Sequence, residues 1–249
     1  MNIIHIILIF ILLFILINNI FLNYIENFED NKNNIIFLNH TELYDILKSN
    51  TPYYNTFYEN DFKVRNVKSI DEYIVKMKDM IVNFNNSEKD LLKECTVIAD
   101  SNIKKLNFNY FDGIKASKLV WKIGLTKGEH YEGGLPHTIN DTIILNRNNL
   151  FDKDYLIKIL THEKVHIYQK AYPEDFMKFL KAKNFIVVKK IEESDNIRAN
   201  PDIDMYIYKK NNIIYSMIYK DNPKHITDTV SDIQYYEHPC ETMAIMLTE

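Results

Sequence analysis

Glycine, cysteine and runs of positive charge are scarce in this chain of 249 residues. Its five glycines form neither a Gly-x-Gly-x-x-Gly nor a Walker-type loop, which disfavours Rossmann dehydrogenases, kinases and GTPases. The two cysteines, Cys95 and Cys240, form no Cys-x-x-Cys pair, which argues against a disulfide framework and a cysteine-ligated zinc site. With 30 basic and 34 acidic residues and no Lys/Arg-rich run, the chain also lacks an electrostatic footprint for nucleic acid. We therefore expect no nucleic-acid partner.

The longest apolar run stands at the start of the chain. Residues 3–22 read IIHIILIFILLFILINNIFL, which is close to the roughly 20 residues that a helix needs to cross a bilayer. The first basic residue is Lys32 and no Ala or Gly follows the run, so a cleaved signal peptide is disfavoured. A buried core helix is the alternative, but the run is apolar on every face. We predict a single-pass anchor at residues 1–25 in a host or virion membrane, with its orientation left open.

The rest of the chain predicts one main α+β domain. A polar linker is expected at 26–39, a helical region at 40–106 and the main domain at 107–249. The role of 40–106, as a prodomain, a cover or part of the catalytic unit, stays open. Apolar spacing and capping residues predict helices at 41–48, 69–84, 87–106, 154–171 and from 239 onward. Short β-branched or aromatic runs predict strands at 118–125, 142–145, 185–189, 204–208 and 213–219.

One motif in the predicted helix 154–171 carries chemistry. His162-Glu163-Lys164-Val165-His166 places two histidines one helical turn apart, so both imidazoles can bind one zinc ion at ~2.0–2.1 Å. Glu163 projects from an adjoining flank, where it can take a proton from a metal-bound water. The alternative is a pair of core histidines, since the motif is flanked by apolar residues.

A catalytic zinc site needs a third protein ligand and a position for water. The candidates lie in the segment 235–244 (YYEHPCETMA), which begins a helix because Pro239 suits a first helical turn. This pairing of His-Glu-x-x-His with a later Pro-x-Glu-x-x-Ala helix resembles the gluzincin metallopeptidases. The resemblance implies a zincin-like fold and Glu241 as the third ligand, with Glu237 and His238 as alternatives. The chain departs from the family pattern at His238, where many relatives have Asn.

The resemblance extends to other parts of the C-terminal half. The run 162–169 (HEKVHIYQ), together with 135–138 (LPHT), also looks like uncharacterised metallopeptidase-like proteins of giant DNA viruses and some protists. The gluzincin resemblance implies that the strand 142–145 binds an extended peptide along its edge. Transition-state or substrate contacts would come from His137 first, and then from Tyr236 and His225. Other candidates are His130, Glu132, Tyr206, Tyr208 and Tyr235.

These observations lead to one expected function and two alternatives. We expect a membrane-anchored zinc metallopeptidase that acts on peptide or protein substrates, with Glu163 as the general base. One alternative is a non-catalytic membrane or virion protein that retains the metal-binding fold, although the intact Glu163 argues against it. The other is a zinc hydrolase of a non-peptide bond, which the same chemistry would serve.

Overall fold

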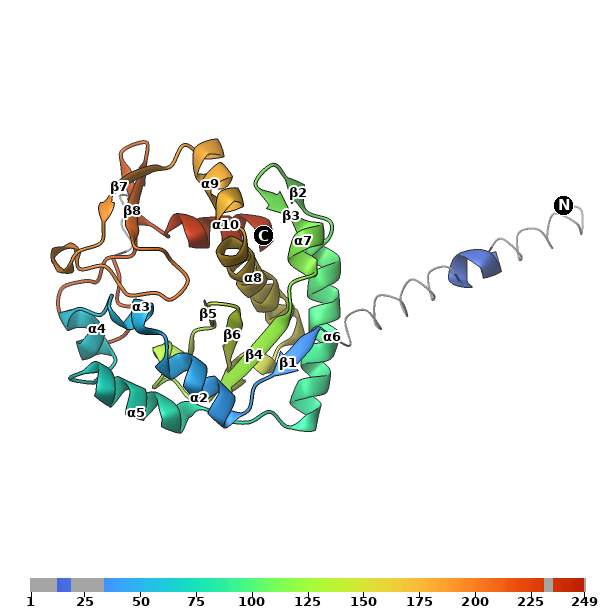
Figure 1. Cartoon of the computed structure of the whole chain (residues 1–249), viewed down its shortest axis with the longest axis horizontal. Coiled ribbons are helices and arrows are strands. Elements are labelled where there is room, and N and C mark those ends of the chain that lie inside the picture. Colours follow the sequence, from blue (N-terminus) through green and yellow to red (C-terminus); the bar gives the residue numbers. More distant parts are fainter. Residues whose placement is uncertain (1–12, 19–33, 231–234, 249) are drawn as a thin grey trace, which may run out of the picture.

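A computed structural model describes residues 13–18, 34–230 and 235–248 and has a mixed α+β architecture, as predicted (Figure 1). The predicted anchor lies mostly outside the described residues, and its described part, 13–18, is helical and exposed. Within the described ranges, no helix is long and apolar enough to cross a membrane.

The central sheet holds four strands in the order β1-β4-β6-β5. Strands β1 (Ile35–Phe37), β4 (Trp121–Thr126) and β6 (Thr142–Asn146) run parallel, and β5 (His137–Ile139) is antiparallel to β6 at the edge. The prediction of a linker at 26–39 is wrong at its end, because residues 35–37 pair with β4 and become part of the sheet.

Helices cover both faces of this sheet, and alternate residues of β6 show which ones (Figure 1). Ile143 and Leu145 share a core with α6 (Asn86–Ile103) and α8 (Lys153–Ala171). Ile144 points to the other face, where it joins the core formed with α2 (His40–Lys48) and α5 (Ile70–Met80). The predicted helical region 40–106 therefore packs on both faces of the sheet, and its last helix shares a core with the helix that carries the His-Glu-x-x-His motif.

A second sheet follows α8 and has the order β10-β9-β8-β7. Its hairpin was predicted, and it turns at Asn211 and Asn212, whose φ values of 51° and 64° suit the left-handed conformation that Asn tolerates. The last helix, α10 (Pro239–Thr248), packs against α8 through a shared core that includes Val165 and Met243.

The remaining bounds show where local patterns misplaced or missed elements. The predicted strand 118–125 begins only at Trp121, because a short helix and its terminal turn occupy 113–118. Pro173 ends the predicted helix but also begins another, α9, which was not predicted. The other elements are α2 (His40–Lys48), α3 (Thr51–Tyr54), α4 (Glu59–Val64), α5 (Ile70–Met80), β2 (Asn107–Phe108), β3 (Phe111–Asp112), α7 (Gly113–Ser117), α9 (Pro173–Ala182), β7 (Ile186–Lys190), β8 (Tyr206–Lys210), β9 (Ile213–Tyr215) and β10 (Tyr235–Tyr236).

Candidate metal centre

Helix α8 positions both histidines of the motif on one face. Asp152 caps the helix by accepting a hydrogen bond from the Tyr155 backbone N–H at 2.9 Å. One turn apart, the rings of His162 and His166 have centroids 4.8 Å from each other. His166 is fully buried, whereas the His162 side chain is 24% exposed, so the pair lies where the protein interior meets solvent.

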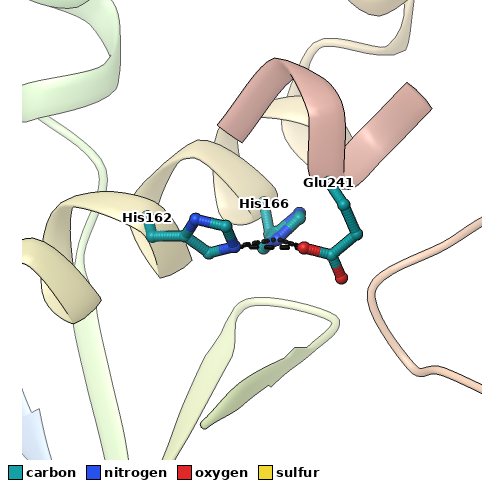
Figure 2. Close-up of side chains that lie close together, drawn as sticks. All are labelled: His162, His166 and Glu241. Atoms are coloured by element: carbon teal, nitrogen blue, oxygen red, sulfur yellow. Dashed lines mark hydrogen bonds and ion pairs between the residues drawn. The ribbon is translucent and has the colours of Figure 1, made fainter. Parts of the chain in front are cut away.

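Helix α10 brings the third side chain from 75 residues farther along the chain (241 − 166). Its start is fixed by His238, whose Nδ1 accepts a hydrogen bond from the Cys240 backbone N–H at 3.1 Å. His238 Nε2 lies 3.2 Å from the Asp204 carboxylate, so this histidine holds the start of the helix and is not at the metal site. Glu241 lies in the first turn of α10 and faces α8 (Figure 2).

The ligand site, which we define as His162, His166 and Glu241, brings three donor atoms together (Figure 2). Glu241 Oε2 lies 3.1 Å from His162 Nε2 and 3.3 Å from His166 Nε2, and the two nitrogens are 3.1 Å apart. Two atoms that each bind a tetrahedral zinc at ~2.0–2.1 Å are themselves about 3.3–3.4 Å apart. The three side chains therefore have the donor types and nearly the spacing that zinc needs.

The close approach of these charged groups shifts the pKa values of His166 and Glu241. Burial lowers the pKa of His166, but the nearby carboxylates of Asp202 and Glu241 outweigh burial and raise the pKa to about 10. Burial raises the pKa of Glu241, and the two imidazoles outweigh it, so that this pKa falls well below its ordinary value. The carboxylates around His166 therefore favour positive charge at this site, and a divalent cation would supply such a charge.

Glu163 lies beside the ligand site without joining it. Its side chain is buried, and Oε2 accepts a hydrogen bond from the Thr138 hydroxyl of β5 at 2.8 Å. Burial, followed by the nearby Asp202 carboxylate, raises the pKa of Glu163 to about 7. A carboxyl group with this proton affinity is suited to exchange protons near neutral pH.

Contacts around the ligand site orient two of its three side chains. Gln169 donates its amide N–H to the Cys240 carbonyl at 2.9 Å, so its Oε1 must accept from His166 Nδ1 at 3.0 Å. This bond leaves His166 Nε2 as the atom that faces the site. On the other side, Asn200 donates to Glu241 Oε1 at 2.7 Å.

The site opens into a cleft of about 650 Å³, a size typical of ligand-binding pockets. Its lining includes residues of α8 and α10 beyond the ligands and residues of the loops 198–202 and 226–227. The wall along the helices is formed by Tyr155, Lys158, Ile159, Ile245 and Thr248. The cleft is therefore mostly apolar along the helices and carries the cation Lys158 on that wall.

The three predicted substrate contacts lie in different places in the structure. His137 lines the cleft, but its two ring nitrogens contact the Tyr131 hydroxyl at 3.0 Å and the Leu135 carbonyl at 3.1 Å. Tyr236 is exposed and stacks on Tyr215 away from the cleft walls, and His225 is exposed next to the wall residues 226–227. The structure therefore brings only His137 of these three to the cleft, and its ring nitrogens already have partners.

The assignment of strand 142–145 as the substrate-binding edge is wrong. This strand, β6, lies between β4 and β5, so both of its edges are already paired. The edge strand next to β6 is β5, and even there Asp202 accepts the Thr138 backbone N–H at 2.8 Å while Lys170 donates to the Thr138 carbonyl. A peptide would need to displace these contacts to pair with Thr138.

The two alternative ligands, Glu237 and His238, lie outside the ligand site. Glu237 lines the cleft wall, outside the group of donor atoms that surrounds the ligand site, and His238 holds the start of α10. Burial raises the pKa of Glu237, and the nearby Arg198 lowers it without outweighing burial. Neither side chain takes the place of Glu241.

No pattern in the sequence gave a role to the residues that support the site from outside the two helices, although the run 135–138 was part of the resemblance. Thr138, Asn200 and Asp202 come from a three-residue strand and an irregular loop, and Asn-Pro-Asp at 200–202 indicates only a turn. Comparisons with models of known protein families, with curated proteins and with solved structures find no match for this chain.

Proposed function

We propose that this chain is a zinc-dependent metallohydrolase, namely a membrane-anchored peptidase with a gluzincin-type, zincin-like catalytic domain. The observation that carries the proposal is the spacing of 3.1–3.3 Å among three donor atoms of His162, His166 and Glu241, with Glu163 beside them. Nitrogen and carboxylate donors in an open set of three suit zinc better than magnesium or calcium.

Each residue of the site has its own role in the proposed reaction. His162, His166 and Glu241 hold the zinc, which supplies a Lewis acid that polarises a carbonyl group and lowers the pKa of water. Glu163 accepts a proton from the attacking water and later delivers it to the leaving amine. The Thr138 hydroxyl donates to Oε2 of Glu163, and we therefore assign the proton transfer to Oε1. The cleft walls exclude bulk water and align the peptide.

The anchor is the second part of the proposal. The apolar run 3–22 supports a helix that attaches the catalytic domain to a membrane. Alkaline carbonate extraction of membranes should leave the full chain in the pellet and release a chain that begins at residue 31. Release of the full chain would contradict the anchor without affecting the metal site.

The test of catalysis is Glu163→Gln in the full chain. Glutamine keeps the shape and can still accept the Thr138 hydroxyl, so zinc content and thermal stability should stay nearly unchanged. Hydrolysis of an unbiased peptide library should fall by ~10²-fold or more, the usual effect of removing a positioned general base.

Glu237→Gln is the matched control, because it neutralises another carboxylate in the same cleft. It should keep both zinc and activity. Full activity in Glu163→Gln with zinc bound would contradict the assigned role. If the zinc-loaded protein cleaves no peptide, the non-catalytic function or a non-peptide substrate takes the place of this proposal.

A further inference from the structure

The two carboxylate oxygens of Glu241 have different surroundings. Oε2 faces the imidazoles of His162 and His166 at 3.1 and 3.3 Å, whereas Oε1 accepts the side-chain N–H of Asn200 at 2.7 Å. The orientation of the Asn200 amide is fixed, because its Oδ1 accepts the Asp202 backbone N–H at 2.9 Å. A flipped amide would place oxygen against oxygen and nitrogen against nitrogen.

The loop around Asn200 is held on both sides. Asp61 accepts the Ala199 backbone N–H at 3.0 Å, and Arg65 donates to the Ala199 carbonyl at 3.3 Å. After Asn200, the ring of Pro201 restricts the backbone, and the Pro201 carbonyl accepts Lys170 Nζ at 3.2 Å. Asn200 therefore presents its amide from a loop whose conformation is fixed by its neighbours.

We propose that Asn200 is a positioning residue that holds Glu241 in coordination through one oxygen only. This inference rests on the proposed zinc site. The hydrogen bond on Oε1 keeps that oxygen turned away from the imidazoles and fixes Oε2 at the ligand site. A carboxylate without this partner can rotate or bind through both oxygens, and the second oxygen would take the position that water needs.

The proposal predicts a specific effect on the metal. Loss of a hydrogen bond that orients a ligand typically weakens metal affinity by 10–100-fold. Asn200→Ala in the full chain should therefore bind zinc ~10-fold or more weakly in competition with a chelator. In the Co²⁺-loaded protein, the visible absorption of Asn200→Ala should shift from that of four ligands towards that of five, because Glu241 then contributes a second oxygen.

Two further variants make the test specific. Asn200→Asp keeps the acceptor for the Asp202 N–H and so preserves the loop, but it places a carboxylate against Glu241. It should weaken zinc binding by at least ~10-fold even if the alanine variant folds poorly. Asn60→Ala is the matched control, because Asn60 donates its amide to Asn196 of the same loop at 2.6 Å and does not touch Glu241. It should leave zinc affinity and the Co²⁺ spectrum unchanged.

The outcomes separate this inference from the proposed function. If the unsubstituted chain binds zinc and both Asn200 variants match Asn60→Ala in affinity and in the Co²⁺ spectrum, the positioning role is overturned and the zinc site stands. If the unsubstituted chain binds neither zinc nor Co²⁺, both proposals fall. Weaker zinc binding in both Asn200 variants, with unchanged binding in Asn60→Ala, supports the positioning role.

Discussion

Two buried clusters of charged residues lie close to each other in this protein, and they differ in how donors meet acceptors. In the ion cluster, which we define as Asp61, Arg65 and Glu132, the guanidinium of Arg65 contacts Asp61 at 3.0 Å and Glu132 at 2.8 and 3.1 Å. Each of these contacts joins an N–H donor to a carboxylate acceptor. The hydroxyl groups of Tyr73 and Tyr219 donate further hydrogen bonds to Glu132 and Asp61, so the acceptors of the cluster meet donors.

The ligand site shows the opposite balance. His162, His166 and Glu241 turn two nitrogens and one oxygen towards a common point, and each of these three atoms can act as a metal ligand. Two of its three side chains are also partly exposed, His162 at 24% and Glu241 at 13%, whereas those of the ion cluster are 3% exposed or less.

The pKa directions alone would not separate the two clusters. Burial raises the pKa of Glu132, and Arg65 outweighs it, so this pKa is lowered as is that of Glu241. What distinguishes a structural cluster from a candidate metal site is therefore the pairing of donors with acceptors, together with access from a cleft.

The strongest test of this difference removes one carboxylate from the ligand site. Glu241→Ala should abolish stoichiometric zinc binding and hydrolysis, because it removes one of three bonds to the ion. Elemental analysis and the peptide-library assay measure both. Glu237→Ala, four residues earlier on the same cleft, should retain zinc. Zinc loss in the Glu237 variant with retention in the Glu241 variant would reverse the ligand assignment.

The ion cluster should respond mainly in stability, and the stoichiometry of zinc binding should not change. Arg65→Met leaves Asp61 and Glu132 buried without their cation, and breaking such a pair costs about 3–5 kcal/mol of unfolding free energy. Denaturant titration measures this loss. Lys63→Met removes an exposed cation two residues away and should change stability by less than about 0.5 kcal/mol. Zinc per folded molecule should stay at one in both variants, and an Arg65→Met protein as stable as its control would refute the structural role.

The sequence predicted which three side chains form the ligand site, but not which residues orient them, and the reasons are physical. His162 and His166 belong to one helix, so a local repeat of 3.6 residues is enough to bring them together. The helix that carries Glu241 has its own local signal in Pro239. Their meeting across 75 residues (241 − 166) depends on the packing of α8 against α10, which no local pattern encodes, and a family resemblance supplied it.

The sheet edge shows where local reasoning fails. Strand β5 has only three residues, too few for an alternating pattern, whereas β6 has a clear apolar run and so attracted the substrate-binding role. Which strand lies at the edge depends on long-range pairing. The roles of Asn200 and Asp202 follow from that pairing and from the loop that passes β5, and neither is visible in the sequence. The pairing within the ion cluster was equally hidden, because Arg65 lies at the C-terminal end of α4 whereas Glu132 begins a short 3₁₀ helix, Glu132–Gly134, farther along the chain.

The smallest predicted effect concerns Gln169, which supports the ligand site. As in the ion cluster, each of its two hydrogen bonds joins a donor to an acceptor. Its Oε1 accepts from His166 Nδ1 and its amide donates to the Cys240 carbonyl. Gln169→Leu removes the acceptor and should weaken zinc binding ~10-fold, which corresponds to about 1.4 kcal/mol, at the low end of the range for contacts behind a ligand. Gln169→Glu loses the donor but keeps an acceptor for Nδ1–H, so its zinc affinity should stay near that of the unsubstituted chain. Zinc affinity, measured by chelator competition on both variants, separates the effect of the bond to His166 from that of the bond to Cys240. Equal weakening in the two would mean that the bond to Cys240, and hence the seating of α10, matters more than the orientation of His166.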